Sequence, residues 1–153
     1  MKNIDTVLFA TDFSEVSDHA FEYALSLAST CNARMVVVHV VTDQVDLRNF
    51  YVPYVSFDEI DKKIEESAQN MLADFCNKWI EQLPGVTSFV MTGIPHEEII
   101  KKATDVKASL IVMGTHGRQG VDHFLFGSTA ERVVKTALCP VLTVRPPQFP
   151  LHD

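Results

Sequence analysis

The sequence contains few cysteines and no long apolar run, and both absences limit the class of protein. Cys31, Cys76 and Cys139 are odd in number, far apart and outside any Cys-x-x-Cys pair. Neither a disulfide framework nor a zinc site is therefore expected, and the three residues are predicted to be reduced core thiols. No apolar stretch approaches the roughly 18 residues that span a bilayer. Because a basic segment followed by an apolar one is also missing at the N-terminus, we expect a cytoplasmic protein.

Basic residues are also scarce. The chain has 13 Lys and Arg against 20 Asp and Glu, a formal net charge of −7. This balance argues against nucleic acid or an anionic membrane as a partner, so any phosphate binding has to be local. At 153 residues, without repeats or low-complexity tracts, the chain has room for one domain. We expect that domain at 1–145, followed by a flexible proline-rich tail at 146–153.

Two common nucleotide-binding motifs are absent. No lysine lies between Lys107 and Lys135, which excludes a Walker A loop there, and the G-x-G-x-x-G fingerprint does not occur. Instead, an apolar run is followed by Gly114-Thr-His-Gly117, nine residues, and then Gly127-Ser-Thr. Glycine adopts positive φ and lets a ligand approach the main chain, and a helix starting at this point would attract anions. The spacing therefore predicts a phosphate-binding loop.

A simpler interpretation of the same residues stays open. Paired glycines are also typical of turns, and Ser128 and Glu131 have the spacing of a capping box, in which Ser128 would only cap a helix. The two roles are compatible, because a hydroxyl that accepts a main-chain hydrogen bond still has a proton to donate to phosphate.

Apolar runs rich in β-branched residues alternate with helix-period segments, which predicts an α/β fold with an open parallel sheet and helices on both faces. The five predicted strands are 6–10, 35–41, 86–91, 109–113 and 141–144. Helices are predicted to start at Ser14, Ser56, Pro95 and Ser128. The predicted apolar face of the second helix comprises Ile60, Ile64, Met71, Leu72, Phe75 and Trp79.

The glycine spacing Gly114-x-x-Gly117, nine residues, Gly127-Ser128 resembles the nucleotide-binding signature of the universal stress protein family. The segments 7–14, 36–41 and 139–144 resemble the first, second and last strands of that family, so the likeness covers residues 2 to 145. It implies a five-stranded, Rossmann-like sheet of the adenine nucleotide alpha hydrolase type and places the chain with the ATP-binding members. It also implies a homodimer through the last strand, Val141–Val144, whose open edge would otherwise expose main-chain groups.

The resemblance further implies that the first and fourth strands are neighbours, so that Thr11 and Asp12 meet Gly114. Asp12 could accept the ribose hydroxyls, hold Mg²⁺ or Mn²⁺ beside ATP, or have a local turn or capping role before the first helix. By resemblance, adenine lies at Val38, His39 and Val40 between Ala10 and Met113. We expect His39 to bond a carbonyl rather than to catalyse. The predicted nucleotide-binding residues are Ala10, Thr11, Asp12, Val38, His39, Val40, Met113, Gly114, His116, Gly117, Arg118, Gly127, Ser128 and Thr129.

Two functions from different classes fit these features. The first is an ATP-binding stress-response protein that acts as a nucleotide-dependent interaction module, with slow hydrolysis at most and with protein partners that the sequence does not identify. The second is a true ATPase or a self-phosphorylating enzyme. Hydrolysis needs a positioned water, a base and charge neutralisation, and Arg118, His123 and Asp122 are candidates without a recognisable catalytic set.

A third class, a receiver domain or flavoprotein of similar size, is disfavoured. Receivers need clustered aspartates and a lysine at strand ends, where this chain has Asp12, Thr92 and Arg145. The aromatic segment 42–55 has two open interpretations, packing on a sheet edge or forming a lid over a ligand or partner surface.

Overall fold

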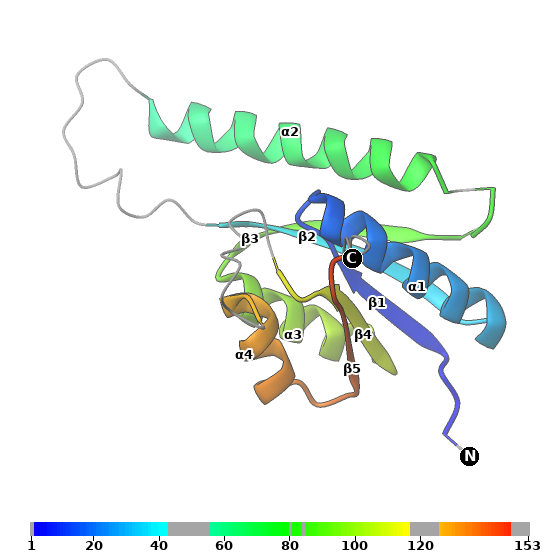
Figure 1. Ribbon diagram of the computed structural model, residues 1–153. Helices are drawn as coiled ribbons and strands as arrows, with labels where there is room; N and C mark the ends of the chain where they lie inside the picture. Colours follow the sequence, from blue (N-terminus) through cyan, green and yellow to red (C-terminus); the bar gives the residue numbers. More distant parts are fainter. Residues whose placement is uncertain (1, 43–55, 80, 84, 117–125, 148–153) are drawn as a thin grey trace, which may run out of the picture.

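Five parallel strands form one open sheet in the computed structural model, which describes residues 2–42, 56–79, 81–83, 85–116 and 126–147 (Figure 1). The strands are β1 (Thr6–Ala10), β2 (Arg34–Thr42), β3 (Thr87–Gly93), β4 (Leu110–Gly114) and β5 (Val141–Val144). Their order across the sheet is β3-β2-β1-β4-β5, with every pair parallel. The fold class predicted from the sequence is therefore confirmed. Residues 43–55 of the aromatic segment 42–55, and the end of the tail, at 148–153, lie outside the described residues.

Four helices cover the sheet. They are α1 (Glu15–Cys31), α2 (Phe57–Asn77), α3 (Pro95–Asp105) and α4 (Ser128–Thr136). Figure 1 shows α1 and α2 on one face and α3 and α4 on the other. The chain winds outward from β1 to β3, then returns to the other side of β1 to form β4 and β5. Because parallel crossovers keep one hand, this reversal puts the two helix pairs on opposite faces and creates a switch point between β1 and β4.

At three helix starts the predicted residues also have the predicted N-terminal roles. The Ser14 and Ser56 hydroxyls accept from the amides of Ser17 and Glu59 at 3.2 and 3.4 Å, and Pro95 is the first residue of α3. The fourth helix, α4, also begins at Ser128 as predicted, but its N-cap is Gly127 and no side chain caps it. Ser128 is already helical, so the prediction that it caps the helix was wrong.

The core has two layers, one on each face of the sheet. On the α1 and α2 side, the Phe21 ring lies 5.0 Å from Phe9 and 4.9 Å from Phe75, measured between centroids, in edge-to-face arrangements. On the other side, Leu8 and Ile111 pack with Val133 of α4. Successive residues of β1 thus serve opposite layers, as a sheet covered on both faces requires.

The predicted apolar face of α2 is buried only in its C-terminal half. Leu72 and Phe75 are buried, but Ile60, Ile64 and Met71 are 43%, 37% and 42% exposed. The helix itself ends at Asn77, before Trp79, which still packs against the core. Only the second half of α2 therefore packs on the sheet.

The cysteines also depart from the prediction of core thiols. All three are unpaired, as expected, but Cys31 is exposed because it is the last residue of α1. Cys76 and Cys139 are half-buried, and burial raises the pKa of both thiols. Among the helices described, none has both the length and the apolar character needed to cross a membrane.

Candidate functional site

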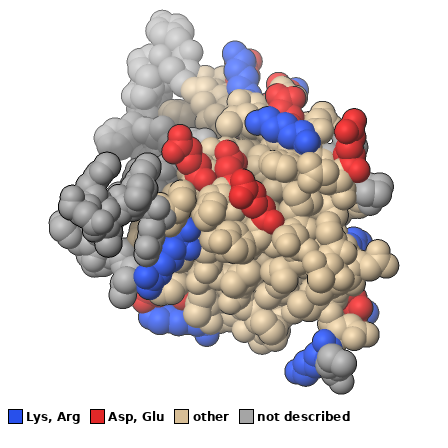
Figure 2. Space-filling model, turned by 45° about the vertical axis from the view of Figure 1, so that its right-hand side comes forward, with Lys and Arg blue, Asp and Glu red and all other residues tan. Residues whose placement is uncertain are grey.

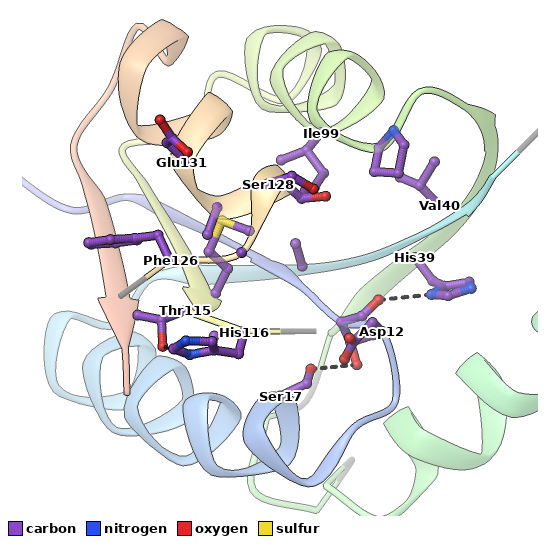
Figure 3. Close-up of a pocket in the computed structure, with 18 of the residues that line it drawn as sticks. Asp12, Ser17, His39, Val40, Ile99, Thr115, His116, Phe126, Ser128 and Glu131 are labelled. Atoms are coloured by element: carbon purple, nitrogen blue, oxygen red, sulfur yellow. Dashed lines mark hydrogen bonds between the residues drawn. The ribbon is translucent and has the colours of Figure 1, made fainter. Parts of the chain in front are cut away.

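A cavity of about 720 Å³ opens where β1, β2 and β4 end (Figure 3). Ala10 pairs with Val38 on one side and Met113 on the other, so Thr11 and Gly114 leave the sheet side by side. All the predicted nucleotide-binding residues line this cavity except Gly117 and Arg118, which lie outside the described residues together with Asp122 and His123. The sheet's switch point therefore brings together residues that are more than 100 positions apart in the sequence.

The turn after β1 is held by short-range hydrogen bonds. The Thr11 hydroxyl accepts from the Phe13 amide at 3.0 Å and from the Ser17 hydroxyl at 2.8 Å. The Ser14 amide and hydroxyl donate to Asp12 Oδ1 at 3.0 and 2.5 Å. Phe13 completes the turn with φ of 62°, a left-handed conformation that is uncommon for an aromatic residue. The local turn role considered for Asp12 is therefore present, and it directs a carboxylate to the cavity wall.

His39 supports this turn from the neighbouring strand. Its Nδ1 lies 2.8 Å from the Thr11 carbonyl oxygen, which can only accept, so Nδ1 carries the proton. The imidazole also packs on Phe13, with ring centroids 4.4 Å apart. The prediction that His39 bonds a carbonyl is confirmed, and Figure 3 shows this bond at the edge of the cavity.

Thr115, which the sequence analysis did not single out, organises the other side of the site. It follows β4 directly and is 2% exposed. Its amide donates to the Val144 carbonyl at 2.9 Å, and its own carbonyl accepts from the Gly127 amide at 2.6 Å. Its hydroxyl lies 2.8 Å from His116 Nδ1. The available signal was a threonine inside the glycine motif, directly after a buried strand.

The glycine motif suggested that its glycines adopt positive φ, but neither Gly114 nor Gly127, the two that the structure describes, does so. Gly127 is extended, with φ of −70° and ψ of 158°. At Gly114 the reason is space, since an added Cβ would lie 3.0 Å from Val16 Cγ1. Gly114 therefore lets α1 approach the end of β4 closely.

The positive end of the cavity is the start of α4. Glu131 is the first residue whose amide bonds back along the helix, to the Gly127 carbonyl at 3.0 Å. The amides of Ser128, Thr129 and Ala130 therefore have no acceptor within the helix and carry the positive end of its dipole. No Lys or Arg belongs to the part of the lining that the structure describes. Attraction of an anion by these residues thus relies on main-chain amides.

Negative groups also border the cavity. The Asp12 and Glu131 carboxylates belong to its lining, and Lys135 pairs with Glu131 at 2.5 Å and lowers the pKa of that carboxyl. Nearby, the pKa of Asp18 is raised, first by partial burial and then by the charges of Asp12 and Glu15, while Lys78 opposes the shift. Within the described ranges, no three His, Cys, Asp or Glu side chains gather as a metal site would require.

Further lining residues come from elements that the prediction did not include. Pro95 and Ile99 belong to the first turns of α3 and add an apolar wall. The remaining lining residues not predicted from the sequence are Ser17, Thr42, Thr115, Phe126, Ala130 and Glu131. Ser17 lies in α1, Thr42 ends β2 and Thr115 follows β4, whereas Ala130 and Glu131 lie in α4. Their meeting depends on how these elements pack, which the local sequence does not report.

Comparison with known proteins agrees with this geometry. The sequence matches the universal stress protein family over residues 3–145. The universal stress protein MJ0531 of Methanocaldococcus jannaschii is 35% identical over 144 residues, covering 93% of this chain and 82% of the relative. The solved structure of protein MJ0577, from the same organism, superposes with a TM-score of 0.84 at 27% identity and covers 97% of this chain and 100% of its own.

Two more distant structures share the fold. One is a universal stress protein in complex with cAMP, with a TM-score of 0.68, 20% identity and coverage of 94% and 98% of the two chains. The other is the universal stress protein from Archaeoglobus fulgidus in complex with dAMP, with a TM-score of 0.63, 18% identity and coverage of 94% and 99%. The sequence match and the shared architecture lead to one conclusion: this chain belongs to the universal stress protein family.

Proposed function

We propose that this protein binds ATP in the cavity at the β1–β4 switch point and acts as a nucleotide-dependent interaction module. The observation that carries the proposal is the juxtaposition, in one cavity, of an apolar wall and an uncapped helix start. The cavity's volume of about 720 Å³ lies within the usual range of small-molecule sites, roughly 300–1,000 Å³.

The parts of the cavity suit the parts of a nucleotide. Ala10, Val38, Val40, Met113 and Ile99 form an apolar region for the base. The first amides of α4 and the Ser128 hydroxyl suit phosphate oxygens, since helix starts favour anions.

The Asp12 carboxylate lines the cavity directly after β1, where it suits ribose hydroxyls or a Mg²⁺ or Mn²⁺ ion that enters with ATP. The nucleotide complexes of two family structures, with cAMP and dAMP, support an adenine nucleotide as the ligand class.

Binding is better supported than turnover. Phosphoryl transfer in water needs an oriented nucleophile and strong charge neutralisation in the transition state. The described lining supplies two carboxylates and two histidines, and His39 already donates to the Thr11 carbonyl. Asp12 also bonds within the turn after β1, His116 bonds to Thr115 and Glu131 pairs with Lys135, so slow hydrolysis at most is expected.

A homodimer through β5 in the cytoplasm completes the proposal. β5 is an edge strand, and Val141, Leu142 and Thr143 are only half-buried, so a second copy would satisfy the open edge. Leu138, just before β5, is 87% exposed. In Figure 2, uncharged residues make up the middle of the face turned forward, and most Lys, Arg, Asp and Glu side chains lie toward its edges. The three free thiols suit a reducing compartment.

Ser128→Glu tests the site without attacking the fold. A carboxylate in the first turn of α4 is favourable to the helix dipole but repels phosphate at the same amides. We expect ATP affinity in calorimetric titration to fall at least tenfold while the melting temperature stays the same or rises.

The matched control is Ser26→Glu, on the exposed side of α1, which should leave ATP affinity within twofold of wild type. Nucleotide released from denatured wild-type protein and identified by mass spectrometry would support the ligand class directly. Absence of released nucleotide together with absence of binding heat for wild type would refute the proposal.

A further inference from the structure

We propose that nucleotide binding and pairing through β5 are thermodynamically coupled, with Thr115 as the link between them. This inference deepens the proposed function and rests on it. It assigns a regulatory role to Thr115, a residue of the cavity lining that also bonds to the edge strand.

The link is a continuous chain of main-chain hydrogen bonds. Val144, the last residue of β5, accepts from the Thr115 amide at 2.9 Å, and Thr115 in turn accepts from the Gly127 amide at 2.6 Å. Gly127 is the N-cap of α4, whose next three amides form the anion site. Through these hydrogen bonds, Thr115 alone connects the end of the edge strand, Val144, to the N-cap of the proposed phosphate-binding helix, Gly127.

The side chain of Thr115 ties the link to the cavity wall. Its hydroxyl lies 2.8 Å from His116 Nδ1, and His116 lines the cavity next to Thr115 in Figure 3. Because Thr115 is buried and bonded through its amide, carbonyl and hydroxyl, it cannot shift without disturbing β5, α4 or His116.

We expect β5 to be the element whose local stability changes when nucleotide binds. It has four residues, it is half-exposed over the first three, and β4 is its partner within the described sheet. Short, half-exposed edge elements open at lower free energy than the core.

A second copy paired on the free edge would hold Val144 in place, and a bound phosphate would hold Gly127 and the first turn of α4. Each event thus lowers the ordering cost of the other, which produces positive coupling without a large structural change.

The test measures the dimer dissociation constant by sedimentation velocity, with and without saturating MgATP. We expect ATP to tighten the dimer at least fivefold, within the usual range of coupling factors. By linkage, each dimer holds two ATP sites, so the ATP affinity per site measured well above the dimer dissociation constant should exceed that measured well below it by the square root of this factor, about twofold or more.

Gly127→Pro is the variant that cuts the link. Its φ of −70° suits proline, which lacks the amide proton that Thr115 accepts. Gly127→Ala is the matched control, because it adds a side chain but keeps that proton. Since both changes lie at the binding loop, both can weaken ATP. The coupling factor is the ratio of the dimer dissociation constants measured without and with MgATP. It should fall to within twofold of unity in the proline variant alone.

Hydrogen exchange on wild type provides a readout that needs no variant. ATP should slow exchange of the Thr115 amide, which points to β5 and away from the anion site. ATP binding with an unchanged dimer constant, absence of a dimer at all, or unchanged Thr115 exchange would each overturn the inference. Absence of ATP binding would instead refute the proposed function, so the two failures are distinguishable.

Discussion

Gly114 shows why one residue of the glycine motif resists substitution. A Cβ at this position would lie 3.0 Å from Val16 Cγ1 and 3.5 Å from the Val16 carbonyl oxygen. A contact this short forces α1 or β4 to move. We expect Gly114→Ala to lower the free energy of unfolding by about 1–3 kcal/mol, as measured by urea denaturation.

Val16, the residue that a Cβ at position 114 would contact, provides the control. In a Val16→Ala background, the close Cγ1 atom is missing, so Gly114→Ala should cost less than half as much as in wild type. An equal cost in both backgrounds would mean that steric contact with α1 is not the reason for the glycine. The motif predicted that Gly114 lets a ligand approach the main chain. Packing against α1, which is distant in sequence, is a second reason for the glycine, and local spacing cannot reveal it.

At the scale of one element, α2 joins a buried half to an exposed half. Leu72 is 2% exposed and Ile64 is 37% exposed, although both belong to the apolar stripe of one helix. We expect Leu72→Ala to cost about 2–5 kcal/mol, because it leaves a cavity in the core. Ile64→Ala should cost less than about 1 kcal/mol. Thermal or urea unfolding of the two variants makes the comparison, and a similar loss for both would show that the whole stripe is buried.

The α4 element shows where local pattern was insufficient. Ser128, Glu131 and their spacing are those of a capping box, yet Gly127 takes the cap position. The cause is tertiary, because the Gly127 amide donates to Thr115 at the end of β4. This frees the Ser128 hydroxyl from capping, which suits the ligand role proposed for it.

At the scale of the whole molecule, the proposed function is retention of a nucleotide rather than its consumption. We expect steady-state ATP turnover below about 1 s⁻¹, the lower end of ordinary enzymes, even at saturating MgATP. Phosphate release from purified protein measures it, with Ser128→Glu as the control for contaminating ATPase. Turnover well above that value, abolished in Ser128→Glu, would favour the alternative of a true ATPase.

The sequence by itself determined the fold class, the strands and most of the cavity lining. Alternation of apolar strands with helix-period segments is a local property. The resemblance to the universal stress protein family, together with the common edge at which parallel strands end, placed Asp12, Val38 and Gly114 near one another. The order of the strands came from family resemblance rather than from periodicity.

Only the tertiary structure decided which apolar residues are buried, what Gly114 is for and what Thr115 does. Each of these depends on the distance between elements far apart in the chain: half of α2 extends beyond the part that packs on the sheet, α1 lies against β4, and β5 and α4 share hydrogen bonds with Thr115. Periodicity encodes the face of an element, but packing determines what that face meets.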